Sequence, residues 1–210
     1  MLERSKPRTV LINKSSARLP RAERRQQLVQ VARDVFAEHG FDAATLEQIA
    51  EQAGISRPIL YSHFGDKQGL FEAVAEQEIS RLKTVVTQSL IEPGESHQLL
   101  ERSLCAFFTD MHENPAGHVV LTRDVPLGLT NSGLDQMLAG LGEQITAVIT
   151  SSDPSAAKDQ TPVPIFAHAL IGAAFHIGRW WRDHPEVPLD QVVSTATELF
   201  WTGFHGIRSR

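Results

Sequence analysis

The sequence predicts an all-α protein of about nine helices. In every long segment the apolar residues recur at three- and four-residue spacing, which places them on one face of a helix, and no long segment has the alternation of a strand. Prolines and glycines divide the chain into pieces of helical length. Within residues 45–67, two short helical patterns follow each other so closely that only a tight turn can join them.

The first two predicted helices are marked by their ends. A first helix is predicted by an apolar stripe formed by Leu28, Val31, Ala32, Val35 and Phe36. This helix is predicted to stop near His39 and Gly40. Thr45 and Gln48 have the spacing of a capping box, so a second helix is predicted to begin there. Gly54 is predicted to end it, because glycine accepts the positive φ that a tight turn requires.

The third predicted helix follows the turn directly. The hydroxyl of Ser56 is predicted to cap it, and Pro58 falls in its first turn, where no intrahelical N–H is lost. The residues predicted to pack the second and third helices together are Ile49, Ala50, Ile55, Leu60 and Phe64. The outward face of the third helix then carries Arg57, Pro58, Ser62 and His63. A helix exposed in this way fits the major groove of DNA.

This segment closely resembles the DNA-binding domain of the TetR family of bacterial transcriptional regulators. The resemblance covers about residues 21 to 75 and is carried by Ile49-Ala50, Ala53-Gly54-Ile55-Ser56, Leu60-Tyr61-Ser62-His63-Phe64 and Lys67. Pro58 stands where many members have a small residue, a departure that can change the bases read. The resemblance implies a helix-turn-helix domain over residues 21–67 and a ligand-binding and dimerisation domain over residues 68–210.

The resemblance also implies which residues contact DNA. Arg57 and Pro58 would meet base edges, and phosphates would be held by Thr45, Tyr61, His63 and Lys67. The chemistry agrees, since arginine suits guanine O6 and N7 and a proline ring can pack on a thymine methyl. Ser56, Ile59 and Ser62 complete the predicted set. The alternatives are that Arg57 is merely solvated and that Tyr61 closes the small core.

The charge is divided unevenly along the chain. Residues 1–25 hold eight Lys or Arg and two Glu, a net charge of +6, which leaves −11 for the other residues of a chain whose net charge is −5. Residues 1–20 are therefore predicted to form a basic, flexible arm that reaches phosphates or an adjacent minor groove. The equal alternative is a disordered leader that only improves solubility.

Composition narrows the class further. With 210 residues and 41% hydrophobic content, the chain can bury a sizeable core. It has no run of 18 apolar residues and no signal-peptide pattern, so a cytoplasmic protein without a membrane partner is expected. Cys105, the only cysteine, excludes an intramolecular disulfide and is predicted to be a small core residue.

The remaining helices follow from stripes and breakers. Asp66 is a predicted cap for a long helix that reaches about residue 90 and could couple the two domains mechanically. Later helices are predicted at about 95–113, 116–123, 134–150, 163–183 and from 189 onward. The polar residues 151–160 are predicted to form a mobile loop.

Aromatic residues in the second domain predict a ligand site. The predicted lining residues are Phe107, Phe108, Met111, Phe166, His168, Phe175, His176 and Trp180. Such walls suit an apolar or aromatic small-molecule effector with one or two hydrogen-bonding groups better than a highly charged metabolite. The alternative is that these aromatics simply fill the core.

The last two predicted helices carry more apolar surface than one core needs, because Trp181 and Trp201 fall off the main stripes. The predicted interface of a homodimer consists of Ile165, Ala169, Gly172, Ala173, Ile177, Val193, Ala196, Phe200 and Phe204. Small residues allow close helix approach, and the resemblance implies that two copies pair these helices into a four-helix bundle. Packing within one subunit is the alternative.

No catalytic motif is visible, and no cofactor is predicted. The nine histidines lack the close ligand spacing of a metal site, so no metal ligand is predicted either. We therefore expect a regulator, most simply a repressor, that leaves a pseudo-palindromic double-stranded DNA operator when it binds its effector. The alternatives are an activator, a regulator without a ligand and, from a different class, an all-α enzyme.

Overall fold

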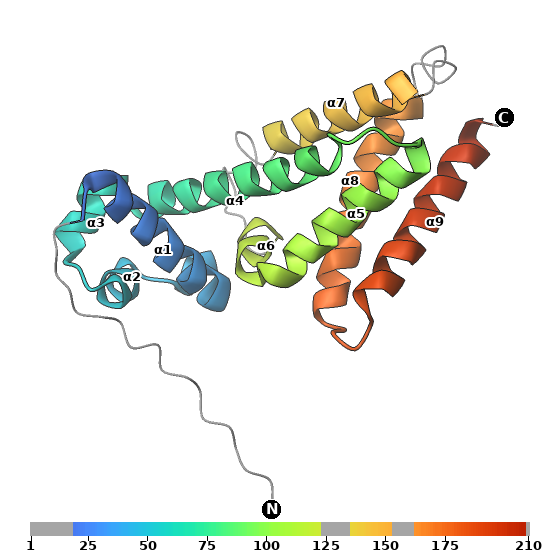
Figure 1. Ribbon diagram of the computed structural model, residues 1–210. Helices are drawn as coiled ribbons and strands as arrows, with labels where there is room; N and C mark the ends of the chain where they lie inside the picture. Colours follow the sequence, from blue (N-terminus) through green and yellow to red (C-terminus); the bar gives the residue numbers. More distant parts are fainter. Residues whose placement is uncertain (1–18, 123–134, 153–161, 209–210) are drawn as a thin grey trace, which may run out of the picture.

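The computed structural model describes residues 19–122, 135–152 and 162–208 (Figure 1). Within these ranges the chain forms nine α-helices and no strand, which confirms the predicted fold class. The helices are α1 (Arg21–Ala43), α2 (Leu46–Ala53), α3 (Arg57–Phe64), α4 (Lys67–Ser89), α5 (Ser96–Glu113), α6 (Pro115–Thr122), α7 (Asp135–Ser152), α8 (Pro162–Arg182) and α9 (Leu189–Arg208). The arm predicted at residues 1–20 and the loop predicted at 151–160 lie almost entirely outside the described residues. None of the described helices is long and apolar enough to cross a membrane.

The molecule is elongated, with a small head and a larger body (Figure 1). Helices α1–α3 form the head, and α4 runs from the head into the body. In the body, α5 packs against both α4 and α9, while α7 packs along α8. Helices α8 and α9 form an antiparallel hairpin at the end of the molecule away from the head.

Head and body have separate hydrophobic cores that share two helices. Helix α4 gives Leu70 and Val74 to the head core and Leu82 and Val86 to the body core. The short helix α6 does the same with two adjacent residues, because Val120 packs into the head and Leu121 into the body. A displacement of α4 or α6 in the body would therefore also displace side chains that pack in the head core.

The ends of the head helices confirm most of the sequence analysis. Gly40 breaks the regular geometry of α1 with φ 80°, close to the predicted stop, and the helical segment then continues to Ala43. At the start of α4, the carboxylate of Asp66 accepts a hydrogen bond of 2.7 Å from the backbone N–H of Gly69, as predicted.

Two predictions about the body are wrong. Cys105 is exposed on α5 and is not a core residue. Trp181 is not surplus to the core, because its ring is buried and its indole N–H donates to the carbonyl of Val187 at 2.8 Å. Its neighbour Trp180 is the exposed one. One residue turns a helix by about 100°, so a small error in the assumed stripe exchanges an inner for an outer position.

Candidate nucleic-acid interface

Helix α2 and the turn after it have the predicted local geometry. The hydroxyl of Thr45 accepts from the backbone N–H of Gln48 at 3.2 Å, and the Gln48 side chain accepts from the backbone N–H of Thr45 at 2.9 Å. Gly54 lies in the left-handed region with φ 66° and ψ 34°. Both ends of α2 are thereby fixed, and α3 is held at a defined angle to it.

Helix α3 buries Leu60, half-buries His63 and Phe64 near its end, and exposes its other side chains. Leu60 points into the head core, while Ile55 and Phe64 pack against that core at either end of the helix. Pro58 lies in the first turn as predicted. Ser56 precedes the helix, but its hydroxyl makes no capping hydrogen bond, so that prediction is wrong. The hydroxyl of Ser56 is therefore exposed and free for a contact outside the chain.

The exposed side chains of α3 include all of the predicted base-contacting residues. Arg57, Pro58, Ile59, Tyr61 and Ser62 are exposed, with 43% of Tyr61 accessible. The guanidinium of Arg57 donates to the hydroxyl of Tyr61 at 3.3 Å and forms an ion pair with Glu47 of α2. The hydrogen bond with Tyr61, supported by the charge of Glu47, raises the pKa of Arg57. The free protein thus holds Arg57 against its own helix, and a base edge would have to replace these partners.

Lys67 has an internal role that the sequence did not suggest. Its Nζ donates to the backbone carbonyl of Asp42 at 3.0 Å and lies 4.6 Å from the centre of the Phe41 ring. Lys67 thereby ties the start of α4 to the end of α1. The N-terminus of α4 is also occupied by the Asp66 carboxylate, which satisfies one of its free N–H groups. A phosphate contact by Lys67 stays a prediction.

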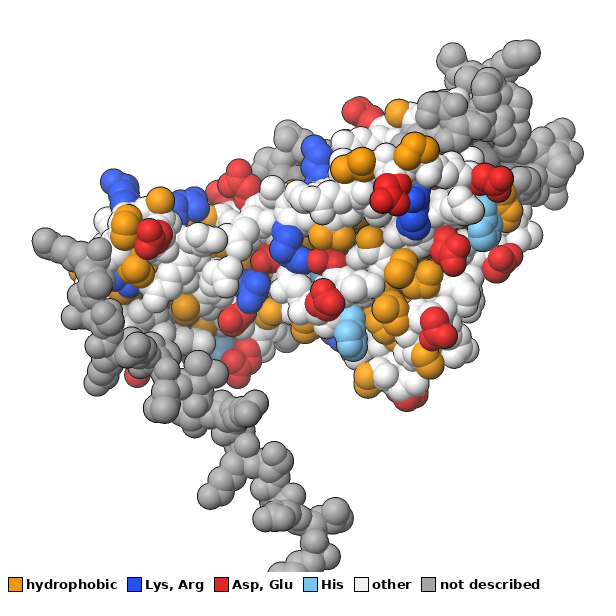
Figure 2. Space-filling model, in the orientation of Figure 1, with side chains coloured by type: hydrophobic (Ala, Val, Ile, Leu, Met, Phe, Trp, Pro, Cys, Tyr) orange, Lys and Arg blue, Asp and Glu red, His pale blue; other side chains and the backbone are white. Residues whose placement is uncertain are grey.

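Arginines at the start of α1 extend the basic surface toward α3. Burial, together with the charges of Arg21, Arg25 and Arg24, lowers the pKa of His63 near the end of α3. The guanidinium of Arg25 lies 5.0 Å from the centre of the Phe64 ring. Figure 2 shows blue side chains at the outer end of the head. In the sequence these arginines belong to the basic segment of residues 1–25, and no local pattern shows that α1 places them beside α3.

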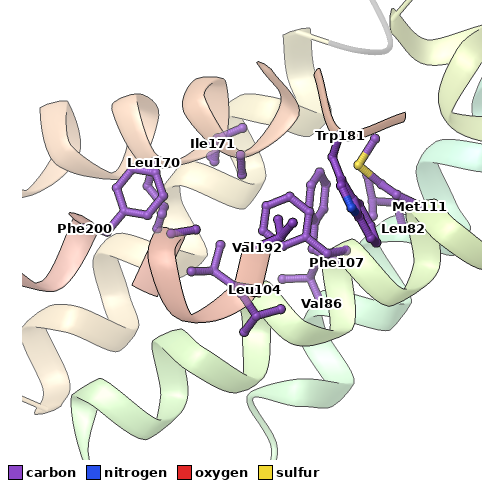
Figure 3. Packing of buried hydrophobic residues seen from close by; sticks show 14 of the residues in the cluster. Leu82, Val86, Leu104, Phe107, Met111, Leu170, Ile171, Trp181, Val192 and Phe200 are labelled. Atoms are coloured by element: carbon purple, nitrogen blue, oxygen red, sulfur yellow. The ribbon is translucent and has the colours of Figure 1, made fainter. Parts of the chain in front are cut away.

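The predicted ligand-binding residues divide into two groups. Phe107 and Met111 are buried in the body core together with Phe108 (Figure 3). Phe175 of α8 packs edge to face on Phe107 at 5.2 Å between ring centres. Gly178 lets α8 approach this cluster closely, since a Cβ there would overlap the sulfur of Met111. Phe166 lies near the start of α8 and packs on Phe200.

The other predicted lining residues lie on the surface. His168 is exposed, and its Nδ1 is 2.8 Å from the carbonyl of Pro164. His176 is exposed as well, and Trp180 packs beside His184 with 48% of its surface accessible. The prediction that these residues line one wall with Phe107 is therefore wrong. His176 and Trp180 share the outer side of α8, one helical turn apart, whereas the ring of His168 lies beside Gly142 of α7.

The predicted dimer interface divides in a similar way. Ile165, Ala169 and Gly172 are exposed on α8, with Ala173 and Ile177 half-buried beside them. Val193, Ala196 and Phe200 are buried in the subunit's own core, so they cannot form the interface. Leu199 is a large apolar side chain that α9 exposes. The side chain of Phe204 lies outside the described residues.

Family models match two segments of the chain. Residues 28–74 match the model for bacterial regulatory proteins of the tetR family, and residues 96–203 match the model for the tetracyclin repressor-like C-terminal domain. The first match covers the head from α1 into α4, and the second covers most of the body from α5 into α9.

Relatives and solved structures agree with these matches. The chain is 29% identical over 195 residues to the HTH-type transcriptional activator FasR of Mycolicibacterium smegmatis, covering 91% of this chain and 87% of FasR. It is 42% identical over 65 residues to the HTH-type transcriptional repressor AcnR of Corynebacterium glutamicum, covering 31% of this chain and 35% of AcnR. A TetR-like regulator from Rhodococcus sp. RHA1 superposes with a TM-score of 0.74 at 26% identity, covering 90% of this chain and all of that one.

One further structure shares the fold. The transcriptional regulator FadR from Bacillus subtilis, in complex with stearoyl-CoA, has a TM-score of 0.73 at 18% identity, covering 83% of this chain and 96% of FadR. The helix-turn-helix geometry and both family matches lead to one conclusion. The chain belongs to the TetR family of bacterial regulatory proteins, and it is a DNA-binding transcriptional regulator rather than an enzyme.

Proposed function

We propose that the protein is a homodimeric cytoplasmic repressor that leaves a pseudo-palindromic operator when a small, largely apolar effector occupies its body. The exposed face of α3 is the observation that carries the DNA-binding part. It presents a guanidinium, a proline ring and hydroxyls beside the arginines of α1. Two copies related by a two-fold axis would read half-sites about 10 bp apart in successive major grooves.

The surface of the α8–α9 hairpin supports the homodimer. Ile165, Trp180 and Leu199 are large apolar side chains exposed on this hairpin. Gly172 has open space around the position of a Cβ, so a second helix could approach the backbone there. A second copy related by two-fold symmetry would cover these exposed apolar side chains with the same surface.

The body core supports an apolar effector. Its aromatic side chains meet edge to face around Phe107, an arrangement that suits aromatic rings and acyl chains. The FadR structure from Bacillus subtilis holds stearoyl-CoA in a protein of the same fold. A specific observation favours a second candidate function, because FasR, a relative that matches along most of the chain, is named an activator. Deleting the gene would raise transcription of a repressed target and lower that of an activated one.

A mobility-shift assay on the DNA upstream of the protein's own gene tests this proposal. An Arg57→Ala variant in the same assay tests the role of the α3 face. We expect Arg57→Ala to lose about 1–3 kcal/mol of binding to that DNA and to relax the base preference at one position in each half-site. Binding to random DNA of the same length should change little. The matched control is Arg21→Ala, which should weaken both DNAs alike and reduce the salt slope by about one. Equal losses on both DNAs for Arg57→Ala would show that Arg57 contacts only phosphate.

His63 predicts a pH dependence of operator binding. Burial and the neighbouring arginines lower its pKa in the free protein, and a phosphate beside it would favour the charged imidazolium. Binding would then take up a proton, so affinity should rise as the pH falls below about 7. The stability of the fold depends on pH in the opposite direction. Because the pKa of His63 is lower in the folded protein than in the unfolded chain, stability is lost as the pH falls through the pKa of the unfolded chain. Titration of affinity against pH should show a shallower rise for His63→Gln, and an identical rise would exclude His63 from the interface.

A further inference from the structure

A buried polar network joins the head to the body where α1, α4, α5 and α6 meet. We call it the junction network; its members are Arg33, Glu78, Arg81, Asp110, Asn114 and His118. Arg81 donates to Glu78 at 3.0 Å and forms a two-pronged ion pair with Asp110. Asn114 donates to Glu78 at 2.8 Å and accepts from Arg33 at 3.3 Å. Helix α1 of the head is thereby connected to three helices that reach the body.

The acidic and imidazole side chains of the network are buried, whereas the side chains of Arg33 and Arg81 are 20% and 33% exposed. Glu78 is 1% exposed and His118 is 2% exposed. Ion pairs at such sites repay their desolvation only partly, and apolar residues of similar size often stabilise a fold as well or better. Burial of this network is therefore poorly explained by stability alone. A role in holding one of two arrangements of the helices fits a regulator that must switch.

The contact between Arg33 and Glu78, which we call the joint, is the weakly bonded part of the network. Arg33 of α1 lies 3.7 Å from Oε1 of Glu78, an ion pair without a hydrogen bond, and this oxygen has no hydrogen-bond partner among the described residues. The joint sits directly beside α6, since a Cβ on Gly117 would overlap Oε2 of Glu78 and the Asn114 amide. A small shift of α6 would therefore be transmitted through Glu78 to Arg33.

His118 is the end of the network that faces the aromatic cluster. Its ring meets Phe107 edge to face at 5.6 Å and lies 6.4 Å from the ring of Phe175. Its Nε2 is 2.9 Å from Oδ2 of Asp110, while its Nδ1 is buried and has no hydrogen-bond partner among the described residues. A buried nitrogen in this state is costly unless something pairs with it.

The chemistry of that nitrogen follows from its neighbours. Burial by itself would raise the pKa of Asp110, but hydrogen bonds from His118 and Arg81 outweigh burial and lower it below its usual value. Asp110 is therefore a carboxylate that can only accept, so Nε2 of His118 carries a hydrogen and donates it. In the neutral imidazole, Nδ1 then presents a lone pair and accepts a hydrogen bond.

We propose that His118 is the residue that recognises the effector's polar group, and that the junction network carries the resulting shift of α6 to Arg33 on α1. The effector class is an apolar, aromatic body with one hydrogen-bond donor, such as a hydroxyl, placed against Phe107 and Phe175. This inference rests on the proposed function, in which an effector in the body controls DNA binding by the head.

Recognition is tested with a matched pair of probes, 2-naphthol and 2-methoxynaphthalene, which share a ring system but differ in the donor. Thermal shift of the dimer without DNA should show that 2-naphthol binds about fivefold tighter or more, the equivalent of one net hydrogen bond. His118→Phe keeps a ring against Phe107 and should bind both probes equally. His118→Leu serves if the larger ring disturbs the fold, and His112→Leu on the outside of α5 is the control. No donor preference in the wild type, or the same preference after loss of His118, would overturn recognition.

Transmission is tested at Arg33. Arg33→Met should still bind 2-naphthol, but the roughly tenfold fall in promoter affinity that the probe causes in the wild type should shrink to less than about twofold. The control is Arg102→Met, which removes a similarly exposed arginine of α5 that pairs with Glu92 instead of the network. Release by 2-naphthol that is unchanged in Arg33→Met would overturn the relay. Absence of specific promoter binding by the wild type would instead refute the proposed function.

Discussion

Ile165→Glu is expected to convert the dimer into folded monomers that no longer hold the operator. Ile165 is 67% exposed in the subunit, so the change leaves the subunit's own core intact. In a two-fold dimer each substitution occurs twice at the same interface. Losing the burial of two isoleucines costs about 3–6 kcal/mol, which raises the dimer dissociation constant about 10²–10⁴-fold, and burying two carboxylates adds to this.

The loss of DNA binding follows from the loss of the second head. A monomer can occupy one half-site only, so it forfeits the gain in effective concentration that linking two heads provides. Light scattering gives the oligomeric state, circular dichroism gives the fold, and mobility shift gives the operator affinity. Ile91→Glu is a matched control, since Ile91 is 71% exposed but lies between α4 and α5, away from the hairpin. A folded dimer with Ile165→Glu would place the interface elsewhere.

The head could be predicted closely because its signals are local. A capping box, a glycine with positive φ and a proline in a first turn each fix a helix end within a few residues of chain. Ser56 failed as a cap although its position was right, because an N-cap residue need not use its side chain. The position of Arg21 beside His63 depends on how α1 crosses α3, and no local pattern contains that information.

The body was harder to predict for two physical reasons. First, a stripe that is apolar on two sides does not say which side faces the core, so Trp180 was placed inside and Trp181 outside. Second, a sequence pattern predicts that polar residues beside an apolar stripe face the solvent. Glu78 and His118 became visible as partners only once α4, α5 and α6 were brought together. His118 is preceded by Gly117, which permits that approach, and this was the available signal.

Phe108→Ala is expected to produce the largest loss of stability in the body. Phe108 is fully buried and packs edge to face on Trp181 at 6.2 Å, so truncation leaves a cavity that costs about 3–5 kcal/mol. This is a large part of the 5–15 kcal/mol that holds a typical domain together. Denaturant unfolding should show a lower midpoint with an unchanged slope. The control is Ile91→Ala, an exposed truncation between α4 and α5 and away from the hairpin, which should change the stability little.

Phe107→Ala separates core packing from effector binding at the adjacent position. Phe107 is buried too, so a loss of stability similar to that of Phe108→Ala is expected. Its ring, however, packs on both His118 and Phe175, whereas the ring of Phe108 packs on Trp181 and on Phe107. The cavity left by Phe107 should therefore open beside the proposed donor-binding nitrogen and change the affinity for 2-naphthol, while Phe108→Ala should leave it nearly unchanged. Promoter affinity without a probe should stay close to the wild type in both, since neither ring reaches the head core. Equal responses of the two variants to 2-naphthol would identify Phe107 as plain core and move the effector site away from α5.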